Sequence, residues 1–209
     1  MDSVFGMNPQ WLGVISLCFG LGYLSGSIPF GILIARVFGL GNLRDIGSGN
    51  IGATNVLRTG SKPAAAATLL LDALKGTLPV VAAMQLVNID GAVAAGFGAF
   101  IGHILPIWLK FKGGKGVATY VGVLLGFGWK FLAVFAVIWL TLAISLRYSS
   151  LAALIASAAV PAYALYTGHI KLALALLAMT VIVYLTHREN IARLFKGQET
   201  RIGSKPKPS

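Results

Sequence analysis

The stretch from Trp11 to Phe38, WLGVISLCFGLGYLSGSIPFGILIARVF, carries a single charged side chain, that of Arg36. About 20 apolar residues suffice for an α-helix to cross the hydrocarbon layer of a bilayer, so this run is long enough to span a membrane. It is too long for a cleaved signal peptide and has only Asp2 as a charge ahead of it, so we expect it to be retained. The stretch therefore predicts a membrane-embedded helical fold.

The composition of the whole chain agrees with that prediction. Of its 209 residues, 56% are hydrophobic and 11% are charged, and the mean hydropathy is +0.81. A soluble domain carries about 25% charged residues, so lipid must solvate most of this surface. The one cysteine, Cys18, lies in an apolar run, which excludes an internal disulfide and a cysteine metal site.

Six further apolar runs follow the first, at Ala64–Val87, Ala92–Leu109, Val117–Phe127, Phe131–Leu146, Leu151–Tyr166 and Leu172–Thr186. The run Val117–Phe127 is short, so it crosses the bilayer only if it is tilted or the bilayer is thin, or else it is re-entrant. Counting it gives seven spans, and omitting it gives six. Glycines spaced four apart, Gly98 with Gly102 and Gly122 with Gly126, predict close helix packing.

The distribution of charge favours seven spans. With seven, one side of the membrane receives the loops that hold Arg44 and Arg58, Lys110, Lys112 and Lys115, Arg147, and the tail from Arg188. The other side keeps only Lys130 and Lys171, with Asp2 and Asp90. Because basic loops stay in the cytoplasm, we expect the N-terminus outside and the C-terminus inside. We expect one polytopic domain over residues 1–196 and a polar, disordered cytoplasmic tail over residues 197–209.

The net charge of +11 follows largely from this positive-inside pattern. The basic residues are not interleaved with aromatic residues, as they are in proteins that bind single-stranded nucleic acid, so we expect no nucleic-acid partner.

Three polar islands between the apolar runs need a separate explanation. The first, GSGNIGATNVLR over residues 47–58, combines glycines, neutral donors and Arg58. Glycines let backbone amides turn toward an anion, and arginine adds a charged fork of donors, so this island is more than a solvated turn.

The second island, FKGGKGVAT over residues 111–119, is a glycine-rich bend that opens a helix. Exposed amides at a helix N-terminus favour phosphate, although Gly116 after Lys115 departs from the nucleotide P-loop pattern. The third island, HRENIAR over residues 187–193, places His187 and Asn190 three apart, on one helical face. Either residue of that pair could instead cap the helix.

The ionisable residues Asp72 and Lys75 lie within the second apolar run, also three apart, and form a pair or line the site. His103 precedes the second island, whereas His169 falls on the opposite side of the membrane. No carboxylate cluster suited to a divalent metal is present in the sequence, so we expect neither a metal nor a cofactor.

The three islands, in this order and spacing, resemble the signature motifs of the bacterial acyl-phosphate:glycerol-3-phosphate acyltransferases, the PlsY family. The resemblance covers nearly the whole chain, including SGSIPFG in the first run and LDALKG in the second. It implies seven helices with cytoplasmic motifs, in agreement with the charge argument. It also implies acyl phosphate and sn-glycerol 3-phosphate as substrates in a bacterial inner membrane, with the bilayer and no obligate protein as partner.

The resemblance also implies roles for residues. Ser48, Arg58, Lys115, His187 and Asn190 are the expected catalytic residues. Glu189, together with Asp72, is expected to be structural. The expected substrate-binding residues are Asn50, Thr54, Asn55, Lys75, His103, Lys112, Gly113, Gly114, Gly116, Thr119 and Arg188.

The implied reaction is attack of the glycerol 3-phosphate 1-hydroxyl on the acyl-phosphate carbonyl. The leaving phosphate is already a good leaving group, so the enzyme mainly has to hold two phosphates together and stabilise an oxyanion. Either His187 or a phosphate oxygen of the substrate receives the proton. An anion transporter is the alternative, which inverted repeats and charges deep in several spans would favour. A purely structural membrane anchor would not need three donor-rich loops.

Overall fold

The computed structural model describes residues 9–203, and within that range the chain is helical and has no strand. The helices, with η for short 3-10 turns, are α1 (Pro9–Gly26), α2 (Phe30–Val37), η1 (Leu43–Asp45), α3 (Ala53–Leu57), α4 (Lys62–Leu86), α5 (Ile89–Ile104), η2 (Ile107–Leu109), α6 (Val117–Phe127), α7 (Trp129–Ser145), α8 (Ser149–Tyr166), α9 (Ile170–Thr186) and α10 (Arg188–Phe195). Asp2 and residues 204–209 of the predicted tail lie outside the described residues.

Four segments are long and apolar enough to cross a bilayer: Pro9–Val37, Lys62–Leu86, Ile89–Leu109 and Ser149–Tyr166. Helices α9 and α10 meet at a bend of 62° and provide a fifth if they are counted together. Helices α6 and α7 are apolar but shorter, with 11 and 17 residues. The prediction of an all-helical membrane protein is therefore confirmed, and each of the seven predicted apolar runs contains helix, although the first and the third are interrupted.

The first apolar run is broken, which its hydropathy alone did not indicate. Helix α1 ends at Gly26 and α2 begins at Phe30, so the segment through Pro29 interrupts what was predicted as one run. Proline has no amide hydrogen and disfavours a helical conformation in the residue before it, so a break here is expected from local chemistry. The carbonyl of Ile28 accepts a hydrogen bond of 2.7 Å from Lys75 Nζ, which provides a partner for a backbone group at the break.

Close contact between α1 and α5 depends on small residues on both helices. A methyl group added to Gly98 would come within 2.2 Å of Phe19 O, and one added to Gly102 within 2.2 Å of Tyr23 O. From the other side, a methyl group on Gly22 would come within 2.0 Å of Ala95 O. The predicted packing role of the glycine pair in α5 is thus confirmed, because only hydrogen fits between the two backbones.

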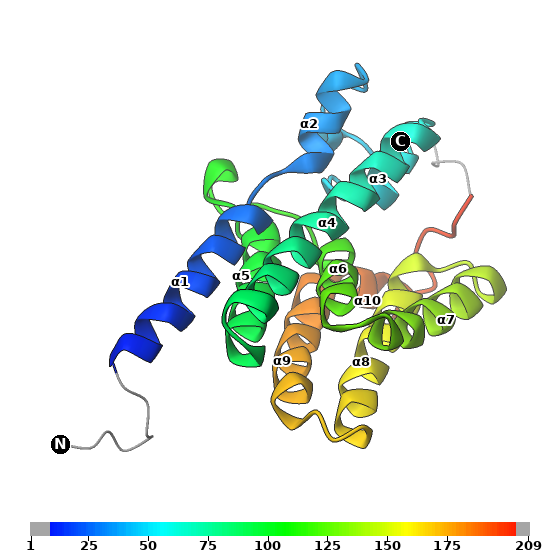
Figure 1. Cartoon of the computed structure of the whole chain (residues 1–209). Coiled ribbons are helices and arrows are strands. Elements are labelled where there is room, and N and C mark those ends of the chain that lie inside the picture. The colour runs from blue at the N-terminus through cyan, green and yellow to red at the C-terminus, as the bar shows by residue number, and fades with distance from the viewer. Residues whose placement is uncertain (1–8, 204–209) are drawn as a thin grey trace.

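Helix α4 packs against α5 and α6, and α7, α8 and α9 follow one another as neighbours (Figure 1). A methyl group on Gly122 would come within 1.9 Å of Ala73 O, so the predicted close packing at this glycine of α6 is also confirmed. Phe100, Tyr120 and Leu124 are fully buried in the main core between these helices.

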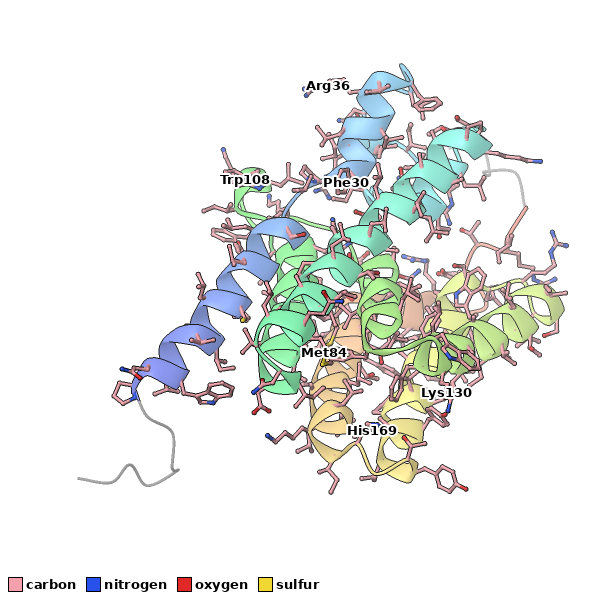
Figure 2. All side chains as sticks on the ribbon, viewed as in Figure 1. Phe30, Arg36, Met84, Trp108, Lys130 and His169 are labelled. Atoms are coloured by element: carbon pink, nitrogen blue, oxygen red, sulfur yellow. The ribbon has the colours of Figure 1, made fainter. Side chains whose placement is uncertain are left out.

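The two ends of the helix array differ in their connections. The long connections around α2 and η2 lie at one end, whereas the short α4–α5 and α8–α9 turns lie at the other (Figure 1). Arg36 and Trp108 mark the first end and His169 the second (Figure 2). Polar loops long enough to build a site are therefore concentrated at one end.

Candidate active site

The first island is shaped by a buried asparagine. Asn55 is 2% exposed, and its Oδ1 accepts from the amide and the hydroxyl of Ser48 at 3.1 and 3.4 Å. Its Nδ2 donates to Asn50 O at 2.7 Å and to Leu43 O at 2.9 Å. An asparagine amide offers two acceptor positions and two hydrogens, so all four are used inside the loop. Asn55, predicted to bind substrate, holds the loop that presents Ser48.

Arg58 ends the same island, immediately after α3, and its guanidinium lies against the backbone of Gly47. A methyl group on Gly47, which has a φ of +54°, would come within 2.9 Å of Arg58 Nη1. Burial lowers the pKa of Arg58, with the charge of Glu199 opposing and that of Arg193 adding to the effect. An arginine nevertheless stays protonated in proteins, so Arg58 contributes a fixed positive charge.

The glycine turn of the second island closes α5 before it opens α6. The amides of Gly113 and Gly114 donate to Ile104 O at 2.9 Å and to His103 O at 3.0 Å, so both are already occupied. A methyl group on Gly114 would come within 2.1 Å of His103 Nε2, which explains glycine there by close packing. The amides of the first turn of α6, after Gly116, are the ones that helix geometry leaves for an anion.

Lys115 connects the second island to the third. Its Nζ donates to Asn190 Oδ1, and its carbonyl accepts from Thr186 Oγ1 at 3.1 Å. Burial lowers the pKa of Lys115, and Arg193 and Arg58 lower it further, while Glu199 and Glu189 oppose them. The structure therefore brings Lys115 and Asn190, two of the residues predicted to be catalytic, into direct contact.

His187 lies between α9 and α10 and is 4% exposed. Its Nδ1 lies 2.8 Å from Val183 O, so this nitrogen carries the hydrogen in the neutral ring and leaves the lone pair on Nε2. Burial lowers the pKa of His187 to about 4, and the charge of Lys115 acts in the same direction while the Val183 contact opposes it. The imidazole is therefore neutral near pH 7 and is a weak proton acceptor.

Glu199 is the main functional candidate that the sequence reasoning missed. Its side chain is 6% exposed and accepts from Asn190 Nδ2 at 2.6 Å, Arg193 Nε at 2.7 Å and Ser150 Oγ at 2.9 Å. Burial alone would raise the pKa of Glu199, but these hydrogen bonds lower it overall, so the carboxylate stays ionised. The predicted disordered tail thus begins with a segment that packs onto the site.

The same segment is held at a second point. Arg147 donates to Ile202 O from Nε at 3.1 Å and from Nη2 at 2.7 Å, and the Ile202 amide donates to Arg147 O at 2.7 Å. The one sequence signal for Glu199 was an acidic residue in a basic tail, in a chain with only 6 acidic residues. That signal alone gave no contact partner.

Arg44 is a further missed residue, because it joins the first two islands. Its Nη2 donates to Lys112 O, and its Nη1 donates to Gly49 O at 3.4 Å. From its sequence position, Arg44 contributes only to the predicted orientation in the membrane. In the structure it fixes the glycine turn relative to the loop that carries Ser48.

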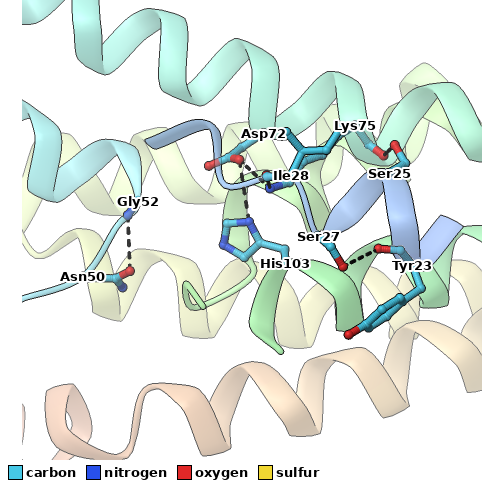
Figure 3. A network of polar contacts seen from close by, with 9 residues as sticks. All are labelled: Tyr23, Ser25, Ser27, Ile28, Asn50, Gly52, Asp72, Lys75 and His103. Carbon is cyan, nitrogen blue, oxygen red and sulfur yellow. Dashed lines mark hydrogen bonds and ion pairs between the residues drawn. The ribbon is translucent and has the colours of Figure 1, made fainter. Parts of the chain in front are cut away.

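Two predicted substrate-binding residues belong to a different, buried network (Figure 3). Lys75 Nζ lies 2.7 Å from Asp72 Oδ1 and donates to Ile28 O, so the predicted Asp72–Lys75 pair is confirmed. His103 Nδ1 lies 3.7 Å from the same Asp72 oxygen. The ammonium group of Lys75 therefore faces the α1–α2 break and Asp72.

The remaining predicted residues differ in exposure. Ser48, Thr54, Lys112, Arg188 and Glu189 are exposed, whereas Thr119 is fully buried and its hydroxyl has no hydrogen-bond partner among residues 9–203. Asn50 Oδ1 accepts from the Gly52 amide at 3.2 Å. Within the described part of the chain, no group of three or more His, Cys, Asp or Glu residues is arranged to hold a metal ion.

Fold and site together define an integral membrane protein whose helices carry a basic, donor-rich site. The chain belongs to the glycerol-3-phosphate acyltransferase family, whose family model matches residues 16–197, and it is therefore a membrane enzyme. The resemblance to the PlsY family is thus confirmed.

Relatives support this membership over most of the chain. The glycerol-3-phosphate acyltransferase of Brucella suis is 59% identical over 185 residues, covering 88% of this chain and 91% of the relative. That of Sinorhizobium fredii is 58% identical over 189 residues, covering 90% and 93%. The crystal structure of PlsY (YgiH), described as an integral membrane glycerol 3-phosphate acyltransferase in its glycerol 3-phosphate form, has a TM-score of 0.86 at 35% identity and covers 90% of this chain and 96% of that one.

Proposed function

We propose that this chain transfers a fatty acyl group from acyl phosphate to the 1-hydroxyl of sn-glycerol 3-phosphate. The products are 1-acylglycerol 3-phosphate, a lysophosphatidic acid, and inorganic phosphate, so the reaction is the first step of phospholipid synthesis. The observation that carries the proposal is the contact of Lys115 with Asn190 in the field of Arg58 and Arg193. A second crystal structure of the relative, described as its lysophosphatidic acid form, has a TM-score of 0.83 at 33% identity.

In this reaction the basic residues hold phosphate and the amide stabilises the oxyanion. Lys115 and Arg58 donate to the phosphate groups, together with the free amides at the start of α6 beyond Gly116. Asn190 donates to the oxygen that becomes negative when the hydroxyl attacks the carbonyl. Exposed donors on the loops, those of Ser48, Thr54, Lys112 and Arg188, complete the substrate contacts.

The proton of the attacking hydroxyl goes to a phosphate oxygen of the substrate. The alternative acceptor, His187 Nε2, has a lone pair available but belongs to a ring whose pKa burial lowers to about 4. A base is most effective when its pKa lies near the working pH, and a phosphate monoester, with its second pKa of about 6, is closer. His187 then orients the substrate through a hydrogen bond.

We further propose seven spans, with the N-terminus outside and the site on the cytoplasmic face of a bacterial inner membrane. Residues 1–196 form one membrane domain in this proposal, and the segment that carries Glu199 and Ile202 packs against it. Lys171 and Asp90, paired at 2.7 Å, belong to the sparsely charged end, and the loops of Arg44, Lys112 and Arg58 to the basic one. Cysteines introduced at Lys112 and Lys171 test this, since Cys18 is buried. We expect an impermeant maleimide to label only the second in intact cells.

Phosphate release by the purified protein tests the reaction. We expect release from palmitoyl phosphate that depends on glycerol 3-phosphate, no transfer from palmitoyl-CoA, and full activity in EDTA. Transfer from palmitoyl-CoA but not from palmitoyl phosphate would refute acyl phosphate as the donor. Loss of turnover in EDTA that magnesium restores would refute metal-free catalysis. No turnover with either donor, with saturable glycerol 3-phosphate uptake into proteoliposomes, would instead favour a transporter.

A further inference from the structure

Three ionisable side chains meet inside the helix array in a cluster distinct from the Lys115–Asn190 contact. Asp72, Lys75 and His103 have side chains that are 2%, 3% and 3% exposed, and Asp72 Oδ1 faces both of the others (Figure 3). Burying charged groups in an apolar segment is costly even when they are paired, and apolar residues of similar size often serve stability better. Packing alone therefore does not account for this choice of residues.

One arm of the network holds the break in the first apolar run. Lys75 Nζ donates to Ile28 O, and Ser25 Oγ donates to Lys75 O at 2.9 Å. Helix α4 is thus bonded both to the last turn of α1 and to the segment that follows it. The ammonium also lies 5.7 Å from the ring centre of Phe30, the first residue of α2. Lys75 thus fixes the direction in which the chain leaves α1 toward the first island.

The other arm supports the glycine turn. His103 O accepts the Gly114 amide, and His103 Nε2 lies so close to Gly114 that even a methyl group there would come within 2.1 Å of it. The imidazole therefore packs directly against Gly114, the residue before Lys115. A rotation of this ring would move the turn and the lysine that follows it.

We propose that Asp72, Lys75 and His103 are positioning residues for residues 113–116 and that they set the place of Lys115 without touching the substrate. Asp72 Oδ1 faces the imidazole at 3.7 Å, which is too long for a hydrogen bond, so its charge only biases the orientation of the ring, whereas the ring packs directly against the turn. The inference rests on the proposed role of Lys115 in binding phosphate. It replaces the direct substrate contact expected for Lys75 and His103 with an indirect one.

The first test separates position from stability. His103→Leu removes the polar edge of the ring, and Asp72→Asn keeps the shape of the carboxylate while removing its charge. The matched control is Thr180→Val, which removes a buried hydroxyl bonded to Ser157 O and Leu176 O at 2.8 Å each, in the same array but without contact to the turn. We expect His103→Leu to raise the KM for glycerol 3-phosphate at least tenfold with kcat within about threefold. His103→Gln should recover most of that loss.

Thr180→Val should lower the melting temperature and leave KM unchanged. Equal KM values in His103→Leu, Asp72→Asn and Thr180→Val, at a temperature where all are folded, would overturn the proposal. If the wild-type protein itself shows no glycerol 3-phosphate-dependent turnover, the proposed function fails instead.

The second test does not need activity. A cysteine replacing Lys115 reports the exposure of the turn through its rate of maleimide labelling, because Cys18 is buried. We expect the rate to rise at least fivefold when His103→Leu is added, and to stay within twofold when Thr180→Val is added. An unchanged rate with His103→Leu would refute the positioning role, whatever the enzyme's substrates.

Discussion

Lys75 and Lys115 lie in two polar clusters of similar composition, each with a histidine, a second polar side chain and a nearby acid. Lys75 is 4% exposed, and its ammonium faces a carboxylate and a carbonyl, so its charge is balanced inside the protein. Lys115 contacts the neutral amide of Asn190, with Arg58 and Arg193 close enough to lower its pKa further and only Glu199 and Glu189 opposing them. We propose that the partners of each lysine, and not its residue type, distinguish the structural role of Lys75 from the substrate-binding role of Lys115.

This comparison predicts its largest effect at Lys115. Replacing Lys115 by alanine should lower kcat/KM about a thousandfold, because a charged donor to a phosphate is lost from a partly desolvated site. Lys62→Ala is the matched control, since Lys62 is an exposed lysine at the start of α4, outside the three islands. We expect it to change kcat/KM by less than about threefold. Similar losses in both variants would mean that a diffuse basic surface, and not Lys115, binds substrate.

A smaller effect is expected at the acid that orients Asn190. Glu199→Gln replaces an acceptor of three hydrogen bonds by a group that must turn an NH₂ toward at least one of those donors. We expect a loss of about tenfold in kcat and a lower melting temperature, since an unsatisfied buried donor costs about 1–3 kcal/mol. Glu189→Gln, on the exposed side of α10, should change neither quantity. Full activity of Glu199→Gln would show that Asn190 is held by Lys115 alone.

His187 gives a pH-dependent effect on stability. Because its pKa in the folded protein is about 4, against an ordinary value of 6.5, folding favours the neutral ring. The resulting stability is complete above about pH 6.5 and is lost as the pH falls toward 4, by up to about 3 kcal/mol. The pKa of Glu199 is also lowered from its ordinary value of 4.5. Glu199 therefore adds to the loss of stability only when the pH falls below 4.5.

The melting temperature between pH 4.5 and 7.5 measures this effect. We expect the wild type to lose stability below pH 6.5 and His187→Gln to lose much less over the same range. Parallel curves for the two proteins would assign the acid sensitivity to another group.

The smallest effect is expected at the opposite end of the molecule. His169 lies in the α8–α9 turn, where its Nδ1 is 3.0 Å from Thr167 Oγ1 and its ring meets Phe131 edge-on with centres 5.5 Å apart. We expect His169→Ala to leave kcat/KM within about twofold in the phosphate-release assay. A loss comparable to that of Lys115→Ala would place the site at the wrong end of the helices.

The sequence predicted those features that local composition determines. Apolar length located the helices, and the run Val117–Phe127 coincides with α6 at both ends. The break before Phe30 was missed because an average over apolar residues hides the short segment Ser27–Pro29. The resemblance of the three islands to the family motifs also implied that Lys115 and Asn190 belong to one site, and the two side chains are in contact.

Features that depend on distant contacts were not predictable from the sequence. Asn55 and Ser48 have equally polar side chains, but only the fold shows that Asn55 is saturated by its own loop. Glu199 looked like part of a disordered tail because its partners, Ser150 and Asn190, are 49 and 9 residues away. Likewise, Gly113 and Gly114 suggested a phosphate cradle, yet their amides bond to the end of α5.

Equilibrium binding of radiolabelled glycerol 3-phosphate to the purified protein, without any acyl donor, tests the central claim most directly. The proteins to compare are the wild type, Lys115→Ala and the double variant Asp72→Asn/Lys75→Met, which removes both charges of the buried pair and leaves the net charge unchanged. We expect the wild type to bind saturably, Lys115→Ala to bind at least a hundredfold more weakly, and the double variant to bind about tenfold more weakly. Undiminished binding by Lys115→Ala, or a greater loss in the double variant than in Lys115→Ala, would contradict the assignment of Lys115 to the substrate and Lys75 to the scaffold.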